Sequence, residues 1–153
     1  MKYFEKYLAE HAEAGEDLED IDIAVHCDIT IFDWLMRYVH GLEPQMDPKS
    51  AVSILISAEF LQMDTLIDES LNYVSQNLQA IIKQPIDMCC MSSGLVKRLA
   101  GKVNIQMLES VHDRKDKLKS KIFMKKLEIL FQDDRNMLYR CAHCSELFTE
   151  GQR

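Results

Sequence analysis

Apolar and polar positions follow two different periods in the first half of this 153-residue chain. Around residues 21–25, Ile21, Ile23 and Val25 alternate with acidic or small residues. A period of two predicts a half-buried β-strand. From residue 28 the spacing becomes helical. The apolar face of this predicted helix consists of Phe32, Leu35, Met36 and Val39.

Three helices are expected between residues 28 and 81. Asp28 or Thr30 starts the first, and Gly41 and Pro44 end it. Asp47 and Pro48 open the second, as a helix cap followed by a proline in the first turn. Its body, residues 51–61, is apolar on nearly every side, so it is expected in the middle of a core. Asp64 caps the third helix, which has a narrow apolar stripe: Ile67, Leu71, Val74, Leu78 and Ile81.

The remaining segments predict further helices. Residues 3–14 form the first helix of the chain, and residues 84–90 form a non-helical connector that contains Pro85. Ser92 or Ser93 caps another helix, and residues 104–111 continue as a short one. Residues 117–131 predict a basic amphipathic helix. Its expected apolar face contains Phe123, Leu127 and Leu130, with Ile122 and Ile129 beside them.

Three of these stretches resemble a known family. They are residues 25–28, the aromatic-rich run at residues 31–38, and residues 52–61, which end in a Phe-Leu pair. Together they resemble the second half of a BTB/POZ domain, and most closely the SANT and BTB domain regulator of class-switch recombination family. The resemblance implies an α+β, predominantly helical fold.

The expected organisation has three parts. Residues 1–83 resemble an incomplete BTB/POZ domain that lacks the usual N-terminal strands and helix, which normally build much of the dimer interface. Residues 84–136 form a helical extension. Residues 137–153 form a tail that resembles half of a zinc knuckle.

Composition and charge narrow the function classes. Hydrophobic residues make up 47% and charged residues 28% of the chain, as in ordinary folded domains. No apolar run approaches the length of a membrane helix, and the first residues lack the apolar core of a secretory signal. The net charge of −7 argues against a dedicated nucleic-acid binder. An odd count of five cysteines favours a reducing compartment, so an intracellular protein, nuclear or cytoplasmic, is expected.

Cys141 and Cys144 are the strongest chemical signal. Two cysteines separated by two residues form a tight turn that can direct both thiolates at one tetrahedral zinc ion. They make a half-site, because no second pair follows them. Three completions are open: His143 with a distant ligand, Cys89 and Cys90, or residues beyond Arg153. The alternative is two ordinary thiols near a terminus.

No catalytic or cofactor-binding residue is expected. His26, Cys27 and Asp28 contain the residue types of a nucleophile, a base and an orienting acid. However, neighbouring strand residues point to opposite faces, so these side chains cannot form the required contacts. Cys27 is expected to pack as a small apolar residue, and Asp28 to cap a helix. Trp34 is expected at the periphery of the core, with an anchor at a partner surface as the alternative.

The resemblance therefore implies a non-catalytic protein–protein interaction module of a nuclear regulator. Such a protein restrains immunoglobulin class-switch recombination through self-association as a homodimer and through corepressor or histone-deacetylase recruitment. No small-molecule substrate and no membrane are expected, and no partner-binding residues are assigned. One alternative is a BTB-type substrate adaptor for a cullin ubiquitin ligase. A second is a zinc-dependent nucleic-acid-binding element at the C-terminus.

Overall fold

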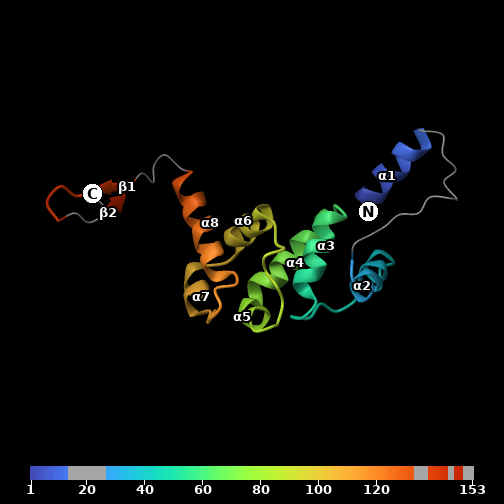
Figure 1. Cartoon of the computed structure of the whole chain (residues 1–153), viewed down its shortest axis with the longest axis horizontal. Coiled ribbons are helices and arrows are strands. Elements are labelled where there is room, and N and C mark those ends of the chain that lie inside the picture. The colour runs from blue at the N-terminus through green and yellow to red at the C-terminus, as the bar shows by residue number, and fades with distance from the viewer. Residues whose placement is uncertain (14–26, 133–137, 145–146, 150–153) are drawn as a thin grey trace. The chain divides into compact units, whose positions relative to one another are not determined.

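The computed structural model describes residues 1–13, 27–132, 138–144 and 147–149. These residues form a predominantly helical structure of eight helices and one short β-hairpin (Figure 1). The chain divides into two compact units, here called the N-terminal unit, Met1–Met91, and the C-terminal unit, Ser92–Arg153. The strand predicted over residues 21–25 lies outside the described residues. The segment boundaries expected at residues 83 and 136 stay predictions.

The helices of each unit follow in chain order. The N-terminal unit contains α1 (Lys2–Glu13), α2 (Ile29–Val39), α3 (Ala51–Phe60), α4 (Asp64–Gln76) and α5 (Leu78–Ile82). The C-terminal unit contains α6 (Ser93–Lys102), α7 (Ile105–Ser110), α8 (Lys119–Phe131), β1 (Leu138–Arg140) and β2 (Leu147–Thr149).

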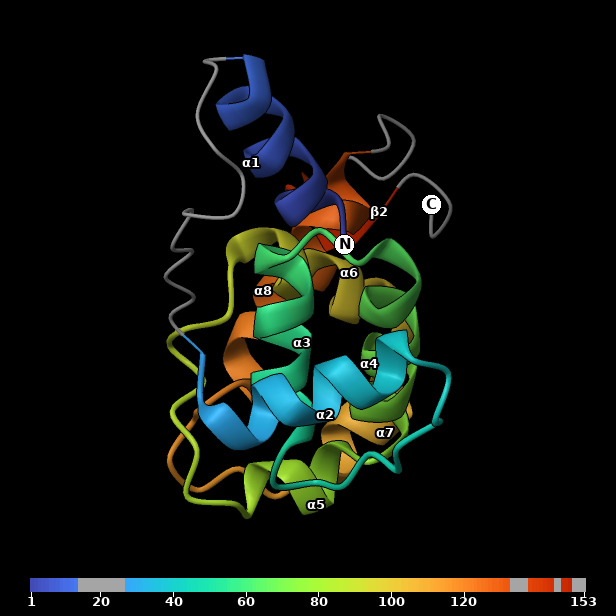
Figure 2. The same cartoon turned by 90° about the vertical axis from the view of Figure 1, so that its right-hand side faces the viewer.

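Helix α3 is the centre of the N-terminal unit. It packs along α4 and against α2, and Figure 2 shows α2 lying across it. Its buried residues are Ala51, Val52, Ile54, Leu55 and Ala58, and Leu61 just beyond the helix is buried too. The prediction of a central apolar helix is therefore confirmed. Ile56 is half-buried, and Phe60 is 49% exposed with its ring 4.8 Å from that of Tyr3.

The apolar stripe of the third predicted helix is buried as expected, but it spans two helices. Leu71 lies in α4 and Leu78 in α5, and the break between the helices falls at Asn77. Both the backbone N–H and the side-chain amide of Asn77 donate to the carbonyl of Tyr73. A side chain that bonds to the preceding turn competes with continued helix formation. The break therefore has a local cause.

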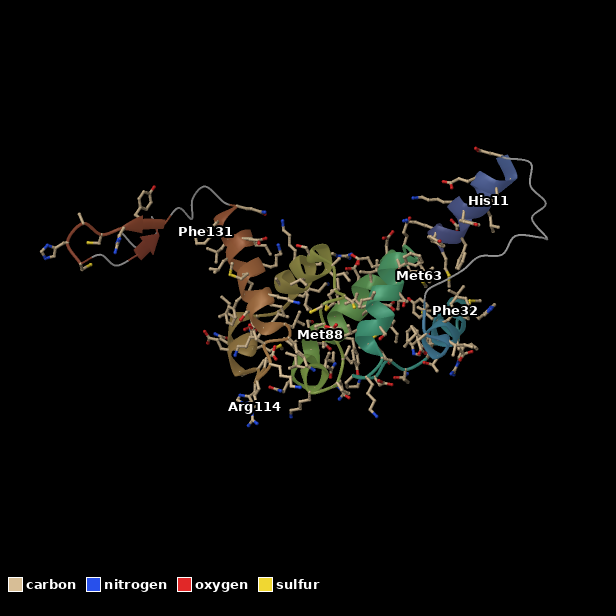
Figure 3. All side chains as sticks on the ribbon, in the orientation of Figure 1. His11, Phe32, Met63, Met88, Arg114 and Phe131 are labelled. Carbon is tan, nitrogen blue, oxygen red and sulfur yellow. The ribbon has the colours of Figure 1, made fainter. Side chains whose placement is uncertain are left out.

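The expected cap at Asp64 is wrong. The residue before α4 is Met63, which is labelled in Figure 3. It makes no side-chain cap hydrogen bond. Asp64 is already in the first turn of α4, where its negative charge interacts favourably with the positive end of the helix dipole. There it pairs with Lys2 of α1. The carboxylate thus connects α1 and α4.

The predicted starts of helices α2 and α3 are confirmed. Asp28 accepts hydrogen bonds from the hydroxyl and the backbone N–H of Thr30, which lower the pKa of its carboxyl. Of the two starts left open, Asp28 is therefore the cap of α2. Asp47 accepts from the backbone N–H groups of Lys49 and Ser50, and this turn leads into α3 at Ala51.

The C-terminal unit is built on the packing of α6 against α8. Ser92 caps α6 by accepting from the N–H of Leu95, as one of the two predicted caps. The predicted apolar face of α8 is buried only in part. Leu127 and Leu130 are 46% and 41% exposed, whereas Ile122 is fully buried. Helix α8 carries apolar residues on two sides, as far as Phe131 at its end (Figure 3), and spacing alone does not say which side is covered.

Asp113 fixes the connection between α7 and α8. Its carboxylate accepts backbone hydrogen bonds from Lys117, Leu118 and Lys119 at 3.1, 2.9 and 3.1 Å. Burial alone would raise the pKa of this carboxyl, but the three N–H groups outweigh that effect and hold the pKa below its usual value. The last of these N–H groups belongs to the first residue of α8. The carboxylate therefore helps to start α8.

The burial of α3 gives the first prediction. Leu55→Ala removes a fully buried side chain and should lower the free energy of unfolding of the N-terminal unit by about 2–5 kcal/mol. Urea unfolding followed by the fluorescence of Trp34, the single tryptophan of the chain, measures this. Ile29→Ala is the control, because Ile29 is 82% exposed and its truncation should cost under about 1 kcal/mol. Equal losses for the two variants would contradict the central role of α3.

Asp113 gives the second prediction. Because the pKa of Asp113 is lower in the folded state, its stabilising effect is complete above the unfolded pKa of about 4 and is lost as pH falls through the folded pKa. Asp113→Asn should cost about 1–3 kcal/mol at pH 7. The difference from the original chain should shrink below pH 4. Thermal unfolding by far-UV circular dichroism from pH 7 to pH 3 measures both effects.

Glu109→Gln is the matched control for Asp113→Asn. Glu109 also belongs to the C-terminal unit and is exposed on α7. Its replacement removes one negative charge and should leave the unfolding curve within about 0.5 kcal/mol of the original. A loss that does not change with pH would contradict the role assigned to the Asp113 carboxylate.

Candidate protein-interaction pocket

A pocket of about 510 Å³ opens on the N-terminal unit. Helix α2, the connector after it and helix α4 supply its walls. The residues that define its chemistry are Trp34, Tyr38, Glu43, Gln45, Glu69 and Tyr73. Pockets of this size are typical of sites that hold a small molecule or a side chain of a partner.

Helix α2 contributes an aromatic wall. Trp34 and Tyr38 are one turn apart on the helix, and their rings stack nearly parallel, with centroids 5.7 Å apart and an interplanar angle of 11°. The indole N–H of Trp34 donates to the carbonyl of Gln45 at 3.0 Å. This bond ties the ring to the connector and fixes its orientation. Trp34 is half-buried, as expected for a residue at the periphery of the core.

Helix α4 contributes the opposite wall with Glu69 and Tyr73, which are also one turn apart. The Tyr38 hydroxyl donates to Glu69 Oε2 at 2.9 Å and so joins the two helices. Burial, together with this hydrogen bond and the negative charge of Glu69, raises the pKa of Tyr38 to about 12. The phenol therefore stays protonated at physiological pH and remains a hydrogen-bond donor.

The connector between α2 and α3 contributes the third side. Gly41 ends α2 with a φ of 73°, so the predicted stop is confirmed. Glu43 has a φ of 46°, a left-handed conformation that is costly for a residue with a side chain. Pro44 follows it and also lines the pocket. This turn places the Glu43 carboxylate at the pocket beside the aromatic wall.

Sequence reasoning did not find this pocket. The signal was present in two pairs spaced by four residues, Trp34 with Tyr38 and Glu69 with Tyr73. Each pair lies to the side of the buried stripe of its helix. A spacing of four residues places each pair on one face of its helix. It does not show that the two helix faces lie next to each other.

Two residues of the candidate catalytic triplet, Cys27 and Asp28, lie in the described part of the chain. The Asp28 carboxylate is engaged by Thr30 as a helix cap. Cys27 is half-buried, with its Sγ 3.3 Å from the Ser57 hydroxyl oxygen. His26 lies outside the described residues.

The Cys141–Cys144 turn joins the two strands of the hairpin, in which Tyr139 of β1 pairs with Phe148 of β2. Cys141 is half-buried, Cys144 is exposed, and neither forms a disulfide. Hydrogen bonds from the backbone N–H groups of Cys144 and His143, and then from the Cys144 thiol, lower the pKa of Cys141. A lowered pKa favours the thiolate form that zinc requires.

The described residues supply less than a complete zinc site. No group of three or more His, Cys, Asp or Glu side chains that could hold a metal ion occurs among them. A structural zinc site needs four ligands, and the turn offers two thiols. Cys89 and Cys90 are exposed in the N-terminal unit. The half-site at Cys141 and Cys144 therefore stays a prediction.

The half-site predicts weak metal binding by this chain. After dialysis with equimolar zinc and a micromolar-affinity chelator, the purified chain should retain well under one zinc per chain, because two thiolates do not close a tetrahedral site. Elemental analysis measures the ratio, with Cys141→Ser/Cys144→Ser as the comparison. One tightly held zinc per chain that is lost in this variant would contradict the half-site and show that further ligands complete it.

Comparison with known proteins gives one family. Residues 1–71 match the model of the BTB domain of SANT and BTB domain regulator of CSR. The match spans α1, α2, α3 and α4 as far as Leu71, and therefore includes most of the pocket. No solved structure matches the chain. In the described part of the chain, no helix is long and apolar enough to cross a membrane. Residues 1–71 are therefore similar to the BTB domain of this family, and the match supports a protein-interaction module in this part of the chain.

Proposed function

We propose that this chain is a non-catalytic interaction module of a nuclear regulator that restrains immunoglobulin class-switch recombination. In this proposal the BTB segment associates with a second copy and recruits corepressor or histone-deacetylase assemblies. The observation that carries the proposal is the match of residues 1–71 to the BTB domain of a regulator family.

The structure of the N-terminal unit supports an interaction role. Its apolar interior is covered by short helices, which leaves their outer faces for contacts with other proteins. The pocket beside Trp34 is such a face, and tryptophan is enriched at the energetic centres of protein interfaces. The carboxylate most suggestive of catalysis in the sequence, that of Asp28, instead caps α2.

Two measurements on the intact chain test the proposal. Sedimentation equilibrium should give a mass that approaches twice that of one chain, because the proposed module self-associates. Affinity purification of the tagged chain from lymphoid nuclei should enrich histone-deacetylase and corepressor subunits at least about tenfold over the control. A tenfold ratio corresponds to about 1.4 kcal/mol of selective binding.

The control chain carries Leu55→Asp, which buries a charge in the centre of α3 and removes the folded module. Enrichment of a cullin without deacetylase or corepressor subunits would overturn the proposal in favour of a ubiquitin-ligase adaptor. A monomer that enriches neither class of partner would also overturn it.

A further inference from the structure

We propose that the pocket between α2, the 43–46 connector and α4 receives an arginine side chain from a short segment of a partner protein. This inference deepens the proposed function, on which it rests, by naming the chemistry that the module recognises. Three features of the pocket carry the inference: its aromatic wall, its charge and the backbone that places its two acids.

The aromatic wall suits a flat cation. The face of an aromatic ring is the negative end of its quadrupole and attracts cations that lie over it. Trp34, the strongest aromatic partner of this kind, is held in place by its hydrogen bond to Gln45. A guanidinium group is planar and stacks on such rings, whereas an ammonium group is more strongly hydrated. The wall therefore favours arginine over lysine.

The charges of the pocket have one sign. Among the described residues that line the pocket, Glu43 and Glu69 are the charged ones, and none is a lysine or arginine. Glu69 uses Oε2 to accept from Tyr38, and its Oε1 makes no hydrogen bond within the described part of the chain. A carboxylate oxygen beside an aromatic face is the acceptor that a stacked guanidinium needs. Both acids are exposed at the pocket, so they would repel an anionic ligand and attract a cationic one.

The backbone supports the same assignment. Glu43 occupies a left-handed conformation that glycine would adopt at less cost. This costly turn holds a carboxylate at the pocket. The neutral Tyr38 hydroxyl fixes Glu69 on the other wall. The two acids thus approach one cavity from separate segments, which is the arrangement that a single bound cation would bridge.

Trp34 offers a direct test, because it is the single tryptophan of the chain. The probe is a capped five-residue peptide, Gly-Ser-Arg-Ser-Gly, titrated into the purified chain while the Trp34 fluorescence is recorded. A saturable change with a Kd of roughly 1–10 mM is expected, since one side chain supplies the affinity. The same peptide with citrulline, a neutral analogue of the same shape, should bind about fivefold or more weakly. The lysine peptide should bind about threefold more weakly.

Matched variants separate the pocket from the overall charge. Glu43→Gln/Glu69→Gln should weaken the arginine peptide about tenfold. Glu10→Gln/Glu13→Gln removes the same charge from exposed positions of α1 and should change the Kd less than twofold. Far-UV circular dichroism confirms that both variants are folded, and the fitted midpoint, not the signal amplitude, is compared.

Several outcomes would overturn the proposal. They are no saturable change up to about 50 mM peptide, equal binding of the arginine and citrulline peptides, equal binding of arginine and lysine, or an unchanged Kd in Glu43→Gln/Glu69→Gln. Because the titration uses a peptide and the isolated chain, its failure would leave the co-purification result of the proposed function intact. A failed co-purification with a successful titration would instead reject the regulator assignment and keep the pocket chemistry.

Discussion

The burial of the apolar residues of α3 is the constraint on which the N-terminal unit depends. A helix without a polar face cannot lie at a surface, so other segments must cover it. Each fully buried leucine or isoleucine of α3 contributes roughly 1.5–3 kcal/mol relative to an exposed one. Helices α2 and α4 provide this cover with Leu35 and Leu71, both fully buried. Their remaining faces are then held in fixed positions, and the aromatic pocket lies where these faces meet.

The elements that could be predicted from the sequence are those whose cause is local. The nearly all-apolar run of α3 follows from the residues of one segment, as does the stripe of α4 and α5. The caps at Asp28 and Ser92 have local causes too. The errors have non-local causes. Asp64 was expected to cap α4 because Asp is a preferred cap residue. Its ion pair with the distant Lys2 cannot be seen in a local sequence pattern. The pocket was missed because it requires residues 34–38, 43–46 and 69–73 to meet, and no short-range spacing encodes that meeting.

Helix α8 shows the same limit in the C-terminal unit. The expected apolar face joined Phe123, Leu127 and Leu130 with Ile122 and Ile129, a set too wide to show which part is covered. The structure buries the side with Ile122, next to the fully buried Leu118. Leu118 is also a residue whose backbone N–H bonds to the Asp113 carboxylate. The turn that starts α8 thus helps to decide which side of the helix faces α6, and this choice depends on three-dimensional hydrogen bonding rather than on periodicity.

The proposed partner chemistry bears on how an acidic chain achieves selectivity. A net charge of −7 attracts any cation, but at physiological ionic strength this attraction fades beyond about 8 Å. It can therefore speed encounters without choosing among partners. Selectivity requires groups that act at contact distance, where a planar cation gains from an aromatic face and a carboxylate at once. In the N-terminal unit the pocket supplies both, with Trp34 fixed by Gln45 and Glu69 fixed by Tyr38. Since both side chains are held before a ligand arrives, binding requires little further ordering of the site, which is the condition under which one side chain of a partner gives measurable affinity.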